Sequence, residues 1–170
     1  AGSAPAIEAE QGLVTGPVPL TPIQRWFFNL ELADPSHFNQ AVLFELKQNV
    51  DPHLLKEAVA SLMVRHDALR LRFQKEGQEW MQTGTDPGAT IPFRSMDLSD
   101  LAPEQKRPAL EKTAAEIQSS LDLSAGPLLQ VALFDLGPGE RQRLLIVVHG
   151  MPWDHAWPLT KRSLAYTNHT

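Results

Sequence analysis

The 170-residue sequence contains no cysteine. Without a thiol the chain forms no disulfide, offers no thiolate ligand to a metal ion and has no cysteine nucleophile. The absence fits a reducing, cytoplasmic setting. Any chemistry must therefore come from other side chains.

Long apolar runs and clustered positive charge are also missing. No run approaches the roughly 20 apolar residues that span a bilayer, and the N-terminus lacks the basic-then-apolar order of a signal peptide. The net charge is −5, and Lys106, Arg107 and Lys112 lie among glutamates. Nucleic-acid binding needs a clustered positive face. We therefore expect no nucleic-acid partner, no membrane partner and a soluble protein.

What is present is the composition of an ordinary globular domain. Hydrophobic residues make up 42% and charged residues 21% of the chain. A chain of this length can bury on the order of 70% of its unfolded surface. We expect one domain with a single sizeable core.

The most informative stretch is the apolar run 144–148, which leads directly into His149. Such a run is typical of a buried strand, which would hold the histidine in one orientation. Two interpretations stay open: a histidine for acid/base chemistry, or a capped or surface histidine at a strand end. We expect no metal site, because His149, Asp154 and His155 match no known zinc spacing.

Periodicity predicts three helices. Thr21 is a candidate N-cap with Pro22 at the first helical position, and further prolines open the other two helices. The helices are expected over residues 22–28, 52–65 and 103–121. Aromatic residues at helical spacing usually pack, so we expect Trp26, Phe27 and Phe28 in the core.

Apolar alternation and short apolar runs predict the strands. They are expected over residues 38–46, 69–73, 79–82, 91–93, 128–136 and 143–149. This order of elements favours an α+β fold, a two-layer sandwich in which a mixed β-sheet is covered by helices on one face. Residues 1–18 lack a sustained period and are interpreted as a linker, and residues 152–170 show no core element.

Four stretches in this order resemble the condensation-type domains of nonribosomal peptide synthetases, within the chloramphenicol acetyltransferase-like superfamily. They are PLTPIQRWFF at 19–28, RHDALRLRF at 65–73, LDLSAGPLLQVALF at 121–134 and LLIVVH at 144–149. The first is similar to the epimerization-type motif P-I-Q-x-W-F. Peptide-bond-forming members usually carry an S-x-A-Q-x-R pattern there.

The resemblance implies a half-domain. Such domains are V-shaped pairs of related halves with a tunnel between them, and the substrate arrives as a thioester on the phosphopantetheine arm of a peptidyl carrier protein. No cofactor of the domain's own is implied. Epimerization members are thought to move the α-proton with the second histidine of an H-H-x-x-x-D-G motif and a glutamate from the other half. The expected partners are the carrier protein and the C-terminal half.

Carried over to this sequence, the motif is incomplete. His149 matches the first histidine, which is mainly structural in the family, and Asp154 matches the aspartate. Gly150 stands where the family places its base, and His155 stands at the final glycine. Glycine cannot take a proton, so we expect this chain alone to be inactive.

The stretch RHDALRLRF supplies a second set of candidates. In the family an arginine typically holds the motif aspartate, and Arg65, Arg70 or Arg72 is the candidate partner of Asp154. The active-site loop would be braced by four residues of this motif, Arg65, His66, Asp67 and Arg70. The simpler interpretation is a helix C-terminus whose basic residues complement the helix dipole.

The resemblance divides the chain into three parts. Residues 1–18 are expected to be a linker from an upstream module, residues 19–149 the N-terminal subdomain of an epimerization domain, and residues 150–170 a divergent tail caused by a frame change or truncation. Two alternatives stay open: half of a peptide-bond-forming condensation domain, and a non-catalytic carrier-protein docking module. Apolar surface left uncovered by the missing half would favour self-association.

Overall fold

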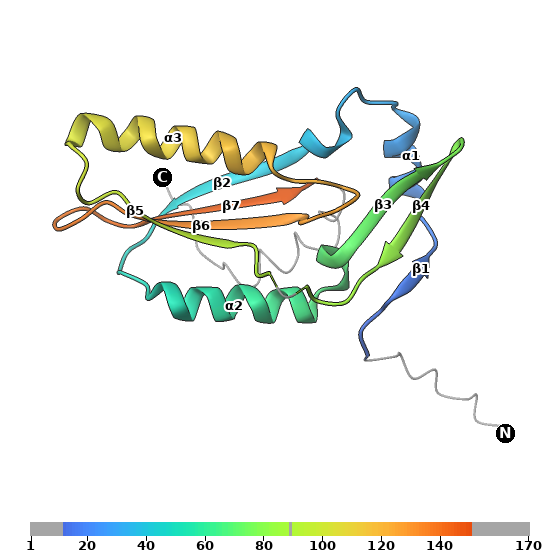
Figure 1. Cartoon of the computed structure of the whole chain (residues 1–170), viewed down its shortest axis with the longest axis horizontal. Helices are drawn as coiled ribbons and strands as arrows, with labels where there is room; N and C mark the ends of the chain where they lie inside the picture. The colour runs from blue at the N-terminus through green and yellow to red at the C-terminus, as the bar shows by residue number, and fades with distance from the viewer. Residues whose placement is uncertain (1–11, 89, 151–170) are drawn as a thin grey trace, which may run out of the picture.

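The computed structural model describes residues 12–88 and 90–150 (Figure 1). Three α-helices are described: α1 Pro22–Asn29, α2 Pro52–Arg65 and α3 Pro103–Ser119. Seven strands are described: β1 Gly16–Val18, β2 Asn39–Glu45, β3 Leu71–Glu76, β4 Glu79–Gly84, β5 Phe93–Asp97, β6 Leu129–Asp135 and β7 Arg143–His149. Two 3₁₀ turns, Pro35–His37 and Asp67–Arg70, complete the element order.

Four strands form the larger sheet, in the order β2-β7-β6-β5. The β2–β7 and β6–β7 pairs are antiparallel and the β5–β6 pair is parallel, so the sheet is mixed. The apolar runs 131–134 of β6 and 144–148 of β7 are typical of central strands, where both faces are covered. The α+β fold and the mixed sheet are thus confirmed.

The helices cover both faces of this sheet, not one face as we expected (Figure 1). Ile117 of α3 packs in a cluster with Phe134 and Val147, whereas Val59 of α2 packs in another cluster with Val131 and Val148. Neighbouring residues of one strand point to opposite faces, so β7 contributes to both clusters. Sequence periodicity shows that a helix has an apolar side but not which face of the sheet it meets.

The second sheet is antiparallel, in the order β1-β4-β3. Helix α1 packs against it through Phe27 and Phe28, and the Phe28 ring stacks on Trp80 with ring centroids 4.0 Å apart. Strand β1 lies within residues 1–18, where we expected no regular element. Three residues are too few to give a periodic signal in the sequence.

Helix α1 begins as its sequence predicts. The Thr21 side chain accepts a hydrogen bond from the Gln24 backbone N–H, and the Gln24 side chain accepts one from the Thr21 N–H at 2.8 Å. This reciprocal cap satisfies two N–H groups that a helix start leaves unpaired. The core expectation was wrong for Trp26, whose side chain is 57% exposed. The buried side of the helix is instead formed by Gln24, Phe27 and Phe28.

Two strand boundaries differ from the expectation. Residues 67–70 form a 3₁₀ turn, so β3 begins at Leu71, and β5 runs from Phe93 to Asp97 rather than over 91–93. The polar residues Arg94, Ser95 and Asp97 give β5 no apolar pattern by which the sequence would predict a strand. Its parallel pairing with β6, from Phe93 opposite Val131 to Asp97 opposite Asp135, is what fixes it.

Candidate functional site

His149 ends β7 and is fully buried. Its backbone N–H donates to the Leu128 carbonyl at 2.8 Å, and its Nε2 lies 2.8 Å from the Pro35 carbonyl oxygen. A carbonyl can only accept, so Nε2 carries a proton and donates it to Pro35. The ring forms a T-shaped pair with the Phe27 ring, with centroids 6.0 Å apart and planes at 88°.

Burial lowers the pKa of His149 below its ordinary value, because the charged ring would lose hydration. The hydrogen bond to the Pro35 carbonyl works in the opposite direction but is the smaller effect. The histidine is therefore neutral near pH 7 and is tied to the 3₁₀ turn Pro35–His37. This geometry favours the structural interpretation of His149 over that of an acid or base.

Gly150 follows directly and is held by the same segment. Its N–H donates to the Phe38 carbonyl at 2.8 Å. A Cβ atom at position 150 would lie 2.5 Å from Cε1 and 2.6 Å from Cδ1 of the Phe38 ring. The backbone of Gly150 does not adopt a positive φ. The neighbouring ring therefore leaves no room for a side chain at position 150, whereas the backbone conformation does not by itself require glycine.

Asp154 and His155 lie outside the described residues, so the structure places neither of them. Among the residues described, no group of three histidine, aspartate or glutamate side chains is arranged to hold a metal ion. No helix in the described ranges is long and apolar enough to cross a bilayer.

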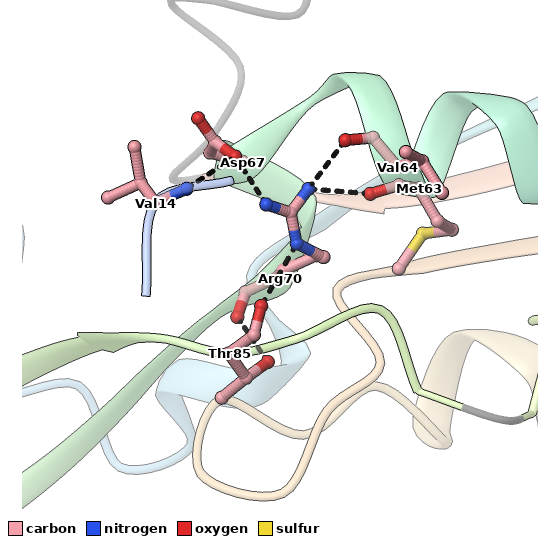
Figure 2. A network of polar contacts seen from close by, with 6 residues as sticks. All are labelled: Val14, Met63, Val64, Asp67, Arg70 and Thr85. Carbon is pink, nitrogen blue, oxygen red and sulfur yellow. Dashed lines mark hydrogen bonds and ion pairs between the residues drawn. The ribbon is translucent and has the colours of Figure 1, made fainter. Parts of the chain in front are cut away.

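Arg70 forms the centre of a buried polar network (Figure 2). Its side chain is 1% exposed and forms an ion pair with Asp67. Nη1 donates to the carbonyl oxygens of Met63 at 2.7 Å and Val64 at 3.0 Å, and Nε donates to the Thr85 carbonyl at 3.0 Å. One guanidinium thus joins the end of α2, the 3₁₀ turn that follows and the chain after β4.

The network is closed by two further contacts. Asp67 also accepts from the Val14 backbone N–H at 3.4 Å, and the Thr85 side chain donates to the Arg70 carbonyl at 2.8 Å. Carbonyls at the end of a helix lack partners within the helix. Arg70 supplies partners for two of them, and its charge complements the negative end of the α2 dipole.

The other candidates of this motif are placed differently. Arg65 is the last residue of α2 and is exposed, and His66 caps the helix through its N–H to the Leu62 carbonyl at 3.0 Å. Arg72 donates to the Leu71 carbonyl at 2.8 Å. Burial lowers the pKa of Arg72, and Asp122 partly offsets this effect. The structure therefore brings Asp67 and Arg70 together and leaves Arg65 on the surface.

Several partners in these contacts could not be identified from the sequence. Pro35, Phe38 and Thr85 contribute carbonyl oxygens or an aromatic ring from segments distant in the chain. Backbone carbonyls carry no residue-type signal. The one sequence feature that could have pointed to these contacts is the aromatic residue Phe38, directly before β2.

The family model described as the condensation domain matches residues 14–154. The chain belongs to the condensation-domain family. Its relatives include linear gramicidin synthase subunits D and C of Brevibacillus parabrevis, each 48% identical, over 88% and 90% of this chain. The chain covers only 3% and 2% of these relatives' lengths.

Solved condensation-family domains share the fold. The epimerization domain from the third module of tyrocidine synthetase B superimposes with a TM-score of 0.74 at 35% identity, over 83% of this chain and 32% of that chain. The starter condensation domain of rhizomide synthetase superimposes with a TM-score of 0.66 at 22% identity, over 81% of this chain and 31% of that one. The chloramphenicol acetyltransferase-like fold is thereby confirmed, and this chain corresponds to the N-terminal part of a condensation-type nonribosomal peptide synthetase domain.

Proposed function

We propose that this chain is the N-terminal half of an epimerization domain, which inverts the α-carbon of an aminoacyl or peptidyl residue from L to D. The substrate would be a thioester on the phosphopantetheine arm of a peptidyl carrier protein. The observation that supports this most is the 35% identity to the tyrocidine synthetase epimerization domain, against 22% to the rhizomide condensation domain.

The first helix adds support from its sequence. Pro22, Ile23 and Gln24 match the epimerization-type motif, and Gln24 has a defined task here because it closes the cap of α1. Gln24 is 6% exposed, whereas Ile23 is 47% exposed. The motif therefore combines a cap that fixes where the helix starts with an apolar surface that the described residues leave open.

The reaction requires a base that the described residues do not provide. A thioester makes the neighbouring α-hydrogen acidic, and a positioned base must come within hydrogen-bond reach of it. Gly150 has no side chain for this task. His149 cannot replace it, because it is fully buried and its Nε2 proton is donated to Pro35. We therefore expect no proton transfer by this chain alone.

The test is a chimera built on the tyrocidine synthetase epimerization domain. Residues 14–149 of this chain replace the matching segment, and the rest, including a histidine at position 150, comes from that domain. With its carrier-bound substrate in heavy water, the chimera should incorporate deuterium at the α-carbon. A matched chimera with Gly150 should fold at least as well, because it avoids the contact with the Phe38 ring, and should show no incorporation. A folded histidine form without exchange would contradict the proposal.

A second function is favoured by the packing around Gly150. Because the Phe38 ring occupies the space next to position 150, the site is arranged for a residue without a side chain. This would suit a docking module that binds the carrier protein and has lost the base. Such a module predicts carrier binding without exchange in both chimeras, and exchange in the histidine form would exclude it.

A further inference from the structure

Within residues 12–88 and 90–150, no strand pairs with the outer edge of β2. β2 is the end strand of the larger sheet and pairs only with β7 among the described strands. Residues 40–43 are all exposed, and the apolar side chains of Val42 and Leu43 are 41% and 47% exposed. An exposed apolar edge is a template for pairing with another strand.

The hydrogen bonds at the two ends of the β2–β7 ladder show which backbone groups are unused by β7. Gly150 N–H donates to the Phe38 carbonyl at 2.8 Å, and Leu46 N–H donates to the Gln142 carbonyl at 3.0 Å. Hydrogen-bonded positions alternate along an antiparallel ladder. The backbone N–H and C=O groups of the even-numbered residues of β2 therefore point toward β7. The outward-facing N–H and C=O groups belong to Asn39, Ala41, Leu43 and Glu45.

The other described edges carry features that block such pairing. The outer side of β3 is covered, because Phe73 N–H donates to the Leu123 carbonyl at 2.8 Å and Ser124 Oγ donates to the Phe73 carbonyl at 3.1 Å. β1 has three residues and contains Pro17. β5 carries the charged residues Arg94 and Asp97. Short length, proline and charge are common ways to protect a sheet edge.

β2 has none of these protections. Its seven residues, NQAVLFE, include no proline, glycine or lysine. Its only charge, Glu45, is paired within the chain to Arg141 at 3.0 Å and Arg143 at 2.9 Å. A neighbouring strand would therefore meet a neutralised carboxylate and an apolar centre.

We propose that β2 pairs antiparallel with β2 of a second copy of this chain, about a two-fold axis at Val42. In this register all seven residues are paired, and each outward-facing residue lies opposite another one. Asn39 meets Glu45, Ala41 meets Leu43, and Val42 meets its own equivalent. No like charges lie opposite each other, and apolar cross-strand pairs stabilise sheets. The pairing depends only on the strand and not on the proposed function.

The second copy is preferred over another partner because the strand is complementary to itself in this register. A two-fold pairing also limits the assembly to two copies, because each copy uses its only long uncovered edge among the described strands. The result would be a continuous eight-stranded sheet across the dimer. Other occupants, such as residues 151–170 or another domain, would leave the chain monomeric.

Sedimentation of the full 170-residue chain tests the pairing. Between about 1 and 100 µM the average mass should rise from that of one 18.9 kDa chain toward twice that mass. Val42→Lys places two like charges together at the axis and should weaken dimerisation by about tenfold or more. The matched control is Leu54→Lys on α2, at a side chain that is 63% exposed and away from the edge. It should leave the dimer unchanged.

Cross-linking tests the register, which is possible because the chain has no cysteine. In a non-hydrogen-bonded antiparallel pair the Cα atoms are about 4.5 Å apart, within the range of a disulfide. Val42→Cys should therefore form a dimer under mild oxidation. Leu43→Cys should not, because its equivalent lies two residues along the partner strand and beyond about 7 Å. A monomer at all concentrations, equal weakening by both lysine variants, or equal cross-linking by both cysteines would each overturn the proposal.

Discussion

Replacing Gly150 by alanine should destabilise the protein through one contact. The new Cβ would lie 2.5 Å from Cε1 of Phe38 and 3.3 Å from its carbonyl oxygen. The backbone cannot simply withdraw, because Gly150 N–H donates to that carbonyl at 2.8 Å. The Phe38 ring, in a residue that is 50% exposed, must therefore rotate away.

The loss of stability can be estimated from the contacts that the Phe38 ring gives up. Phe38 packs against Phe27 with centroids 5.1 Å apart, and losing such an aromatic contact costs about 0.5–1.5 kcal/mol. A displaced χ angle costs about 0.5–1.5 kcal/mol more. Together these give about 1–3 kcal/mol, which corresponds to a melting temperature lower by roughly 2–12 °C for a chain of this size.

A double-mutant cycle isolates this contact. In a Phe38→Ala background the ring is already absent, so Gly150→Ala should change the free energy of unfolding by less than about 0.5 kcal/mol. The free energies are measured by urea unfolding of all four proteins, followed by circular dichroism. If Gly150→Ala costs the same in both backgrounds, the Phe38 ring is not what keeps position 150 without a side chain.

Two further predictions concern Arg70 and His149. Arg70→Met should lower the free energy of unfolding by about 3 kcal/mol, because it removes the partner of Asp67 and of two helix-end carbonyls. The matched control Arg65→Met, at an exposed position, should change the free energy of unfolding by less than about 0.5 kcal/mol. Equal effects in urea unfolding would contradict this network. Burial lowers the pKa of His149 below 6.5. The unfolded chain therefore binds this proton first, and stability should fall as the pH drops from 6.5 through the folded-state pKa. His149→Gln should flatten that dependence, and an unchanged slope would refute it.

The sequence predicted those parts of the fold that depend on local patterns. The apolar runs of β6 and β7 and the cap of α1 were visible because each is encoded within a few neighbouring residues. The faces covered by α2 and α3 were not, because they depend on how distant elements meet. The polar strand β5 was misplaced for the same reason, since its pairing with β6 defines it.

The sequence offered candidate site residues but not their contacts. The placement of His149 at the end of a buried strand was evident from the sequence, whereas the interpretation of Gly150 as the position of the base rests on the family resemblance. The closeness of Phe38 was not, because it follows from the β2–β7 register, in which Asn39 pairs with His149. Arg70 was recognised as part of a motif, yet three of the carbonyl groups that hold it belong to Met63, Val64 and Thr85. Backbone acceptors leave no signal in a sequence.

The most direct test of the central proposal is the configuration of the residue that the chimera releases. The chimera with residues 14–149 of this chain and a histidine at position 150 is incubated with its L-aminoacyl or peptidyl carrier protein, the thioester is cleaved, and the product is separated by chiral chromatography. We predict that the D-isomer accumulates only in the histidine form. If the residue keeps its L configuration and is instead joined to an acceptor amine, the chain is half of a peptide-bond-forming condensation domain and the epimerization proposal is wrong.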